Sequence, residues 1–166
     1  MYDVFSLPPI EFPKDFIWGS ATAAYQIEGD NVDAALWAKE EEYKWARSGK
    51  ACNSYALYKQ DIDLVKQLGH QAYRFSINWS RIEPVEGQWN PEAVEHYVDL
   101  CRRLHENGIK PIVTLYHGEH PLWFEVMGGW KKLDMLKYWA KFVQYMAPKL
   151  AEYVDSWVVL NEFNGG

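Results

Sequence analysis

The chain has 166 residues, with 17 basic and 23 acidic side chains and a formal net charge of −6. This length supports one sizeable core, so we expect a single domain over residues 1–166 with no internal boundary. The acidic balance argues against a nucleic-acid partner, and no stretch resembles a membrane span or a secretory signal. Cys52 and Cys101 are too few for a disulfide framework and lack metal-ligand spacing. Together with the absence of a secretory signal, this predicts a cytoplasmic protein with reduced thiols.

Short apolar runs alternate along the chain with longer segments of helical periodicity. The strand-like runs are residues 16–21, which Gly19 interrupts, and residues 71–77, 112–116 and 157–160. Continuous apolar runs of this length are typical of strands buried on both faces of a parallel sheet. The sequence therefore predicts four parallel strands.

The segments that precede the second, third and fourth predicted strands each have an apolar stripe at helical spacing. The stripes are Tyr58, Ile62, Val65 and Leu68, closed by Gly69; Val94, Tyr97, Val98, Cys101, Leu104 and His105; and Leu136, Trp139, Ala140, Val143, Met146 and Leu150. Asn90 fits the N-cap of the second helix, Pro91 its first position and Gly108 its C-terminal stop. Pro148 is expected to bend the third helix.

Repeated β-α-β units pair their strands in parallel through right-handed crossovers. Two architectures satisfy this order, an open doubly wound sheet and a (β/α)8 barrel. No G-x-G-x-x-G follows the first strand and no P-loop is present, which disfavours the nucleotide-binding sheets. A full barrel needs roughly 250 residues. We therefore predict an α/β fold of the (β/α)8 TIM-barrel type with only the first four βα units, a half-barrel.

Functional groups of such barrels lie on the loops that follow the strands. Here those loops begin with residues 23–29, 78–83, 117–121 and 161–164, which are rich in amides, imidazoles, indoles and carboxylates. A pocket for sugars needs such polar groups together with aromatic faces. No Ser or Cys nucleophile with a partner base stands out, and the histidines lack the H-E-x-x-H zinc spacing.

Several motifs at these positions resemble one known family. They are FIWGSATAAYQIEG (16–29), YRFSINWSRIEP (73–84), TLYHGEHPLWF (114–124), GGW (128–130) and LNEF (160–163). Together, and in this order, they resemble glycoside hydrolase family 1, the β-glucosidases, β-galactosidases and related β-glycosidases. The H-x-x-x-P-x-W-F variant that begins at His117 is similar to the branch that includes archaeal β-glycosidases.

The resemblance implies retaining hydrolysis of a terminal β-linked saccharide or other β-glycoside, without a metal or an organic cofactor. In that family the glutamate matching Glu162 is the general acid/base, and the asparagine matching Asn161 bonds the sugar 2-hydroxyl. Gln26 and His117 match residues that bind glycone hydroxyls. Arg74 matches an arginine that lies beside the nucleophile and helps keep it ionised.

The sequence also departs from the family pattern. The family nucleophile is a second glutamate in an E-N-G motif near the seventh strand, beyond the last residue of this chain. Because retention requires two carboxyl groups about 5–5.5 Å apart, we expect the isolated chain to have little or no hydrolase activity. Gly118, Val159 and Phe163 replace an aromatic residue, a threonine and a proline of the family, which changes the expected shape of the sugar pocket.

Two other functions fit the same residues. One is a non-catalytic half-barrel that binds carbohydrate or self-associates, because unpaired edge strands invite a partner such as the missing C-terminal half or a second half-barrel. The other is part of a different (β/α)8 glycosidase, such as an endo-cellulase, which also carries an N-E acid/base after strand four.

Each candidate site residue also has a structural interpretation. Glu162 is alternatively a solvated carboxylate, His117 a hydrogen-bonded core histidine and Gln26 a backbone-bonding glutamine. Arg74 is alternatively a structural cation paired with Glu162 or another carboxylate. Other residues have only a structural expectation: a hydrated loop for Glu119, His120 and Glu125, a solvated helix face for Glu40, Glu41 and Glu42, and packing for Tyr97, Trp139 and Tyr145.

Overall fold

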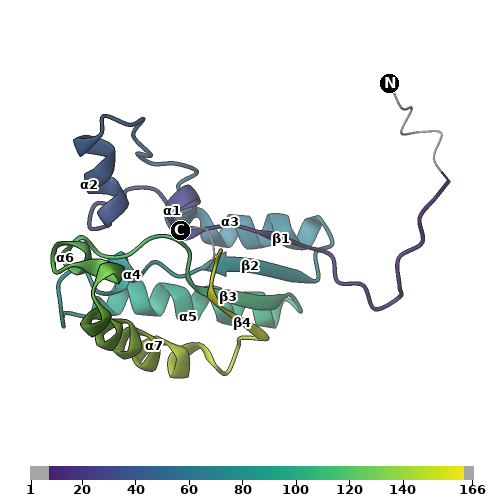
Figure 1. The fold of residues 1–166 in the computed structure, drawn as a ribbon. Coiled ribbons are helices and arrows are strands. Elements are labelled where there is room, and N and C mark those ends of the chain that lie inside the picture. The colour runs from purple at the N-terminus through teal and green to yellow at the C-terminus, as the bar shows by residue number, and fades with distance from the viewer. Residues whose placement is uncertain (1–7, 163–166) are drawn as a thin grey trace.

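A computed structural model describes residues 8–162 of the chain. Its centre is one parallel sheet with the strand order β1-β2-β3-β4 (Figure 1). The strands are β1 (Gly19–Ala21), β2 (Ala72–Ser76), β3 (Lys110–Tyr116) and β4 (Ser156–Leu160). This succession confirms the prediction of four strands that pair in chain order.

The strands are joined by segments that are mainly helical. The helices are α1 (Ala24–Ile27), α2 (Ala35–Glu42), α3 (Ser54–Gln67), α4 (Trp79–Ile82), α5 (Pro91–Glu106), α6 (Leu122–Val126) and α7 (Leu136–Leu150), with the 3-10 turns η2 (Gly129–Lys131) and η3 (Leu133–Met135). The predicted caps of α5 are confirmed, because the Asn90 side chain accepts hydrogen bonds from two backbone N–H groups of the first turn, at 3.0 and 3.3 Å. Pro91 is its first residue.

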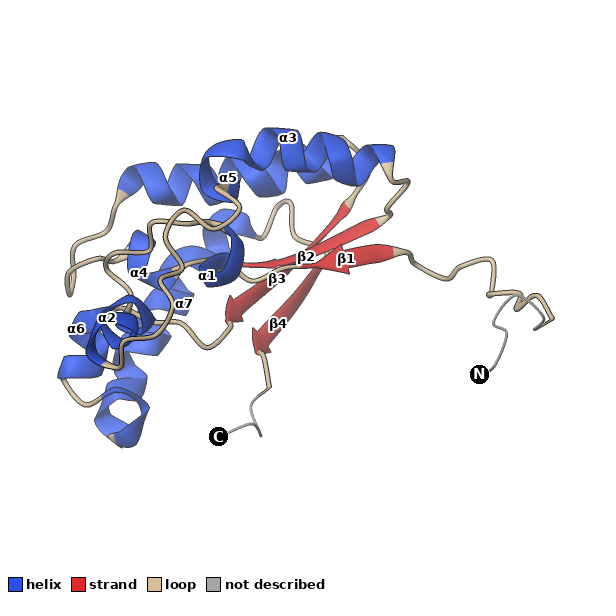
Figure 2. Cartoon of the chain, turned by 90° about the horizontal axis from the view of Figure 1, so that it is seen from above, coloured by secondary structure: helices blue, strands red, loops and turns tan. Residues whose placement is uncertain are grey.

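The core lies between the sheet and the long helices, and Figure 2 shows α3 and α5 running along the same face of the strands. Tyr73 and Phe75 of β2 and Val113 of β3 are buried in this core. Side chains alternate along a strand, so the residues between them face the other side of the sheet. Packing of the three predicted aromatics is also confirmed, with Tyr97 fully buried and Trp139 and Tyr145 partly buried against the core.

Some predicted boundaries and faces are wrong. Strand β1 has only three residues, because the Trp18 N–H donates to the Gln71 side chain instead of extending the ladder. Leu68, Leu136 and Ala140 are exposed, although they were expected in apolar stripes. Phe142 is fully buried instead, so the core-facing side of α7 is rotated from the predicted stripe.

The long connection between β1 and β2 reaches over the loop that follows β3. Ala34 and Pro121 form an antiparallel bridge, and α2 contacts α6. The Ala35 N–H donates to the His120 carbonyl at 2.9 Å. Two of the strand-end loops are therefore joined to each other. None of the helices within residues 8–162 is long and apolar enough to cross a membrane.

Candidate active site

The carboxyl ends of β3 and β4 bring three predicted site residues to one edge of the sheet. The Asn161 N–H donates to the Tyr116 carbonyl at 2.9 Å, which extends the pairing of the two strands past Leu160. His117 directly follows Tyr116, and Glu162 directly follows Asn161. These neighbours in the ladder explain why residues far apart in sequence share this edge.

Arg74 of β2 reaches the same edge along the face of the sheet opposite the core. Its Nε donates to Thr114 Oγ1 at 2.9 Å, and its Nη2 donates to Asn161 Oδ1 at 2.6 Å. Within residues 8–162 it forms no ion pair with a carboxylate, so the alternative of an arginine paired with Glu162 is wrong for this part of the chain. The guanidinium instead orients the amide of Asn161.

His117 is half-buried, and its buried Nδ1 forms no hydrogen bond with any described residue. The interpretation as a hydrogen-bonded core histidine is therefore not supported. Burial lowers the pKa of His117, the positive charge of Arg74 lowers it further, and the Glu162 carboxylate opposes both. The other ring nitrogen of a neutral imidazole, Nε2, has the capacity to bond a sugar hydroxyl.

Glu162 and Gln26 are both exposed. Only Glu162 is directly connected to the group of Arg74, Asn161 and His117, because it follows Asn161 in the sequence. Glu162 has a positive φ of 50° and lies close enough to His117 to act on its charge. Gln26 belongs to α1, which is tied to β2 because the Ala24 N–H donates to Ser76 Oγ at 2.7 Å. No hydrogen bond joins its side chain to the other four site residues within 8–162. Of the departures from the family, Gly118 and Val159 are exposed, and Phe163 lies outside the described residues.

A buried ionic network, which the sequence analysis did not identify, locks the loop after β1 onto the loop after β2. Glu28 accepts hydrogen bonds from Tyr97 Oη at 2.7 Å and from Arg81 Nε at 2.9 Å. Burial raises the pKa of Glu28, while Tyr97 and Arg81 oppose that rise. Glu28 and Arg81 both lie in motifs at strand ends, so the sequence indicated that they are near the site. Only the fold shows that their side chains meet.

The prediction of a hydrated loop after β3 is wrong. Glu119 and His120 are only 5% and 6% exposed. Glu125 forms contacts of 2.9 Å with both His120 and Lys39 of α2. The physical reason is that the connection carrying α2 covers this loop. Burial raises the pKa of Glu119 to about 7.

The prediction of a solvated face at residues 40–42 is also wrong for its first member. Glu40 is buried and accepts hydrogen bonds from Tyr25 Oη at 2.7 Å and from the Ser48 N–H at 3.0 Å. Burial acts to raise its pKa, but these hydrogen bonds outweigh it, and the pKa is lowered. Glu41 and Glu42 are exposed as predicted.

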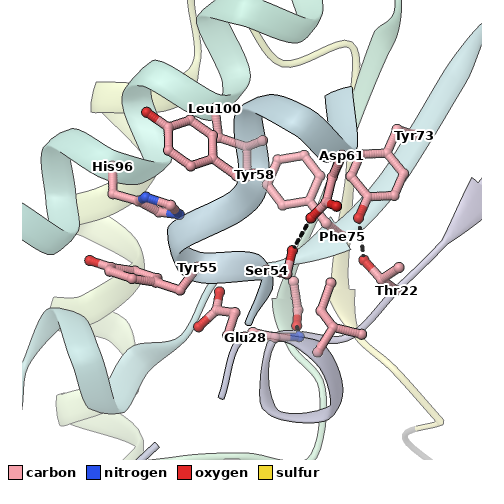
Figure 3. Close-up of a pocket in the computed structure, with 13 residues that line it drawn as sticks. Thr22, Glu28, Ser54, Tyr55, Tyr58, Asp61, Tyr73, Phe75, His96 and Leu100 are labelled. Atoms are coloured by element: carbon pink, nitrogen blue, oxygen red, sulfur yellow. Dashed lines mark hydrogen bonds between the residues drawn. The ribbon is translucent and has the colours of Figure 1, made fainter. Parts of the chain in front are cut away.

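A small cavity lies away from this edge, between the sheet and helices α3 and α5 (Figure 3). Two pairs of its polar lining groups bond to each other: Ser54 Oγ donates to Asp61 Oδ2 at 2.5 Å, and the Thr22 and Tyr73 hydroxyls are 2.7 Å apart. None of the five predicted site residues lines it. We therefore assign the candidate active site to the strand ends rather than to this cavity.

Residues 106–108 have the sequence E-N-G, but the carboxylate of Glu106 does not lie at the site. They end α5 and precede β3, which places them at the opposite edge of the sheet from His117. Glu106 contacts Arg102 of the same helix at 2.7 Å. Its environment is that of a helix surface.

Known proteins resemble the chain over nearly all of its length. The sequence pattern of glycosyl hydrolase family 1 matches residues 9–165. Beta-glucosidase A of Acetivibrio thermocellus is 40% identical over 163 residues, which cover 92% of this chain and 36% of that protein. The cytosolic beta-glucosidase of Homo sapiens is 36% identical over 165 residues, covering 92% of this chain and 35% of that protein. The solved beta-glycosidase from Pyrococcus horikoshii matches with a TM-score of 0.88 and 42% identity, over 93% of this chain and 37% of that one.

The chain belongs to glycosyl hydrolase family 1, and its four parallel βα units form a half-barrel of the (β/α)8 type. The alternative of a different (β/α)8 glycosidase family, such as the endo-cellulases, is therefore wrong. The chain spans only about 36% of the length of the first of these relatives.

Proposed function

We propose that this chain supplies the acid/base side of a β-glycosidase site that hydrolyses terminal β-linked sugars with retention. The observation that carries the proposal is the contact of Arg74 with Asn161, which places an oriented amide directly before Glu162 and beside His117. The family membership supports the same chemistry, and the printed names of the relatives are those of β-glucosidases and a β-glycosidase.

The Arg74 contact assigns a role to each end of the Asn161 amide. Because a guanidinium only donates, the amide oxygen accepts from Arg74, and the amide NH2 group remains free to donate. In the proposed complex this NH2 group bonds the sugar 2-hydroxyl, while His117 and Gln26 bond other glycone hydroxyls. Arg74 itself carries the positive charge that keeps a nearby nucleophilic carboxylate ionised.

Glu162 acts as general acid in the first step and as general base in the second. It first gives its proton to the oxygen of the leaving group, and then takes a proton from the water that attacks the glycosyl-enzyme. The covalent step requires a second carboxylate. Glu28 and Glu119 also follow strands, but both are buried. We therefore propose that a polypeptide of these 166 residues alone is inactive and that the nucleophile comes from further barrel units.

Leaving-group dependence tests the role of Glu162. The 166-residue polypeptide is mixed with a polypeptide carrying the remaining barrel units of a relative, and turnover is measured with β-glucosides of good and poor leaving groups. Glu162→Gln is expected to abolish turnover of the poor leaving group and to spare formation of the glycosyl-enzyme from the good one. The exposed Glu152→Gln serves as the control. Equal losses with both leaving groups, or turnover by the polypeptide alone, would contradict the proposal.

A second candidate function is pairing through β1 and β4, the two outer strands of the sheet. All three residues of β1 are exposed, as are Val159 and Leu160 of β4. In a polypeptide limited to these residues, such edges favour association with the remaining half of a barrel or with a second copy. Sedimentation of the purified polypeptide tests this, and a compact monomer at micromolar concentration would count against it.

We also propose a cytoplasmic location. Both cysteines are free, with Cys52 exposed and Cys101 buried, and a reducing compartment preserves such thiols. The human relative is named as a cytosolic enzyme. Fractionation of cells that express the tagged protein tests the proposal, and recovery in the exported fraction would contradict it.

A further inference from the structure

A chain of polar contacts runs through the loop that follows β3. Trp130 Nε1 donates to Tyr116 Oη at 2.9 Å, and this hydroxyl lies 3.1 Å from His120 Nδ1. His120 Nε2 lies 2.9 Å from Glu125 Oε2, and Glu125 Oε1 lies 2.9 Å from Lys39 Nζ. This series of contacts thus connects helix α2 with the carboxyl end of β3.

The chemistry of the outer members fixes the direction of every hydrogen bond. An indole N–H only donates, so the Tyr116 oxygen accepts from Trp130 and its single hydrogen is left for His120 Nδ1. The hydrogen bonds from Lys39 and His120 lower the pKa of Glu125, which keeps that carboxylate ionised and able only to accept. A neutral His120 ring, which has one hydrogen, therefore carries it on Nε2 and has none on Nδ1.

The surroundings of His120 favour the neutral ring. The residue is buried, and its ring lies edge-on to Phe124, with 5.3 Å between the ring centroids. Burial lowers its pKa; Glu125 opposes that shift and Lys39 adds to it. An apolar side chain of similar size would fill the space, but it would leave the Tyr116 hydroxyl hydrogen and Glu125 Oε2 without these partners.

The other end of this series of contacts lies at the candidate active site. Tyr116 directly precedes His117, and its carbonyl accepts the hydrogen bond from the Asn161 N–H. The ring of Trp130 packs against Tyr116 in a T-shaped contact with 5.0 Å between centroids, and Trp130 is 38% exposed. A change at His120 is therefore transmitted through one side chain to the backbone that holds two site residues.

We propose that His120 is a positioning residue, which as the neutral Nε2–H tautomer ties Tyr116 and Trp130 to the Lys39–Glu125 ion pair. It thereby fixes the end of β3 from which His117 and Asn161 are held. The relevance to sugar binding rests on the proposed function, whereas the tautomer and the coupling rest on the contacts and on the burial of the His120 ring.

Nitrogen NMR of the histidine rings in the 166-residue protein at pH 7 tests the tautomer directly. The expected result is a protonated Nε2 and an unprotonated Nδ1 for His120. A proton on Nδ1, or a rapid average of both tautomers, would overturn the proposal. This measurement needs no variant, so it does not depend on whether a substitution folds.

Two substitutions test the coupling. Tyr116→Phe removes one hydroxyl, so it should shift the signal of His120 Nδ1, which loses its donor, while Glu125 keeps the hydrogen on Nε2. It should also speed exchange of the Trp130 indole hydrogen roughly threefold to tenfold, as expected for one net hydrogen bond. His120→Gln should shift the backbone amide signals of His117 and Asn161. The control is His105→Gln on the exposed end of α5, which should move none of these signals.

The outcomes separate this inference from the proposed function. If Tyr116→Phe leaves the His120 ring and the Trp130 indole unchanged, the coupling does not exist. If the signals change as expected but cellobiose moves neither His117 nor Asn161, the coupling stands and the proposed sugar site is contradicted. The Tyr116→Phe result still decides the matter if His120→Gln does not fold.

Discussion

Arg74 and Asn161 meet at 2.6 Å, and this contact joins β2 to the end of β4 across the intervening β3. The second hydrogen bond of Arg74, to Thr114 Oγ1 of β3 at 2.9 Å, fixes the plane of the guanidinium. A planar fork with two bonds in fixed directions holds the Asn161 amide in one orientation. The orientation of the proposed 2-hydroxyl donor is thus set by a residue two strands away.

The first prediction concerns this fork. Arg74→Lys keeps the charge but loses the paired geometry, so we expect a loss of about 1–2 kcal/mol in the free energy of unfolding, in line with one or two hydrogen bonds to a charged group. The side-chain amide signals of Asn161 should also shift. Urea unfolding and NMR measure both effects. Arg47→Lys, in an exposed ion pair with Glu41, is the control and should change the stability little.

The second prediction concerns the buried pair of Glu28 and Arg81. Glu28→Ala leaves Arg81 and the Tyr97 hydroxyl without their partner, so we expect a loss of about 3–5 kcal/mol in the free energy of unfolding. A domain of ordinary stability would then be close to unfolding. Denaturant unfolding, combined with a double-mutant cycle using Tyr97→Phe, checks this. Additive effects of the two substitutions would show that the network is not coupled.

The third prediction is a loss of stability in mild acid through His96. Its ring stacks on Tyr55 with 4.0 Å between centroids, and burial, followed by the charge of Arg81, lowers its pKa from 6.5 to about 4. The unfolded chain therefore binds a proton on His96 near pH 6.5, whereas the folded chain binds it only near pH 4. The free energy of unfolding consequently falls as the pH falls from about 6.5 to 4. The upper bound is roughly 3.5 kcal/mol, at about 1.4 kcal/mol per pKa unit.

Comparison of the wild type with His96→Gln measures this effect. The variant lacks the titrating ring, so its free energy of unfolding should depend less steeply on pH between 6.5 and 4. Identical slopes for the two proteins would show that other groups, rather than His96, govern acid stability.

The fourth prediction has the opposite sign and concerns Glu119. Burial raises its pKa from 4.5 to about 7, so the folded chain keeps a proton that the unfolded chain has released. Stability from this group is complete below pH 4.5 and is lost as the pH rises to about 7. Glu119→Gln should therefore become more stable relative to the wild type as the pH rises from 5 to 8. Thermal unfolding across this range tests it, and a constant difference would contradict it.

The fifth prediction concerns Gly29, which has a φ of 81° and lies against the backbone of Lys50. A Cβ atom there would overlap the Lys50 carbonyl, so Gly29→Ala adds a steric clash to the strain of the left-handed backbone. Gly87 has a similar φ of 74° with no neighbour within 4 Å of a Cβ. Gly29→Ala should thus destabilise the protein by at least about 2 kcal/mol more than Gly87→Ala. Equal losses would mean that Lys50 moves aside freely.

Local sequence patterns were sufficient for much of the fold. The boundaries of α5 follow from Asn90, Pro91 and Gly108, because caps and stops act within a few residues of the helix end. The order of four parallel strands follows from short apolar runs separated by helical segments. By the same logic, the residues after each strand had to share one edge of the sheet.

Errors arose where a residue's environment is made by a distant part of the chain. Glu40, Glu119 and His120 were expected in water, but they are buried by contacts with Tyr25, with the loop after β2 or with the connection that carries α2. The exposed Leu136 and buried Phe142 show the same limit for α7. A periodic stripe predicts an apolar face only to within the rotation that packing finally selects.

The sequence by itself determined which residue types stand at each strand end, because strand and helix signals are local and the motifs lie beside them. It also determined the family resemblance, which depends on the order of those motifs. Only the tertiary structure decided that Arg74 bonds Asn161, that Glu28 bonds Arg81 and that His120 lies between Tyr116 and Glu125. These contacts depend on strand register and on loops that fold across one another, and neither is encoded within a few residues of the side chains that meet.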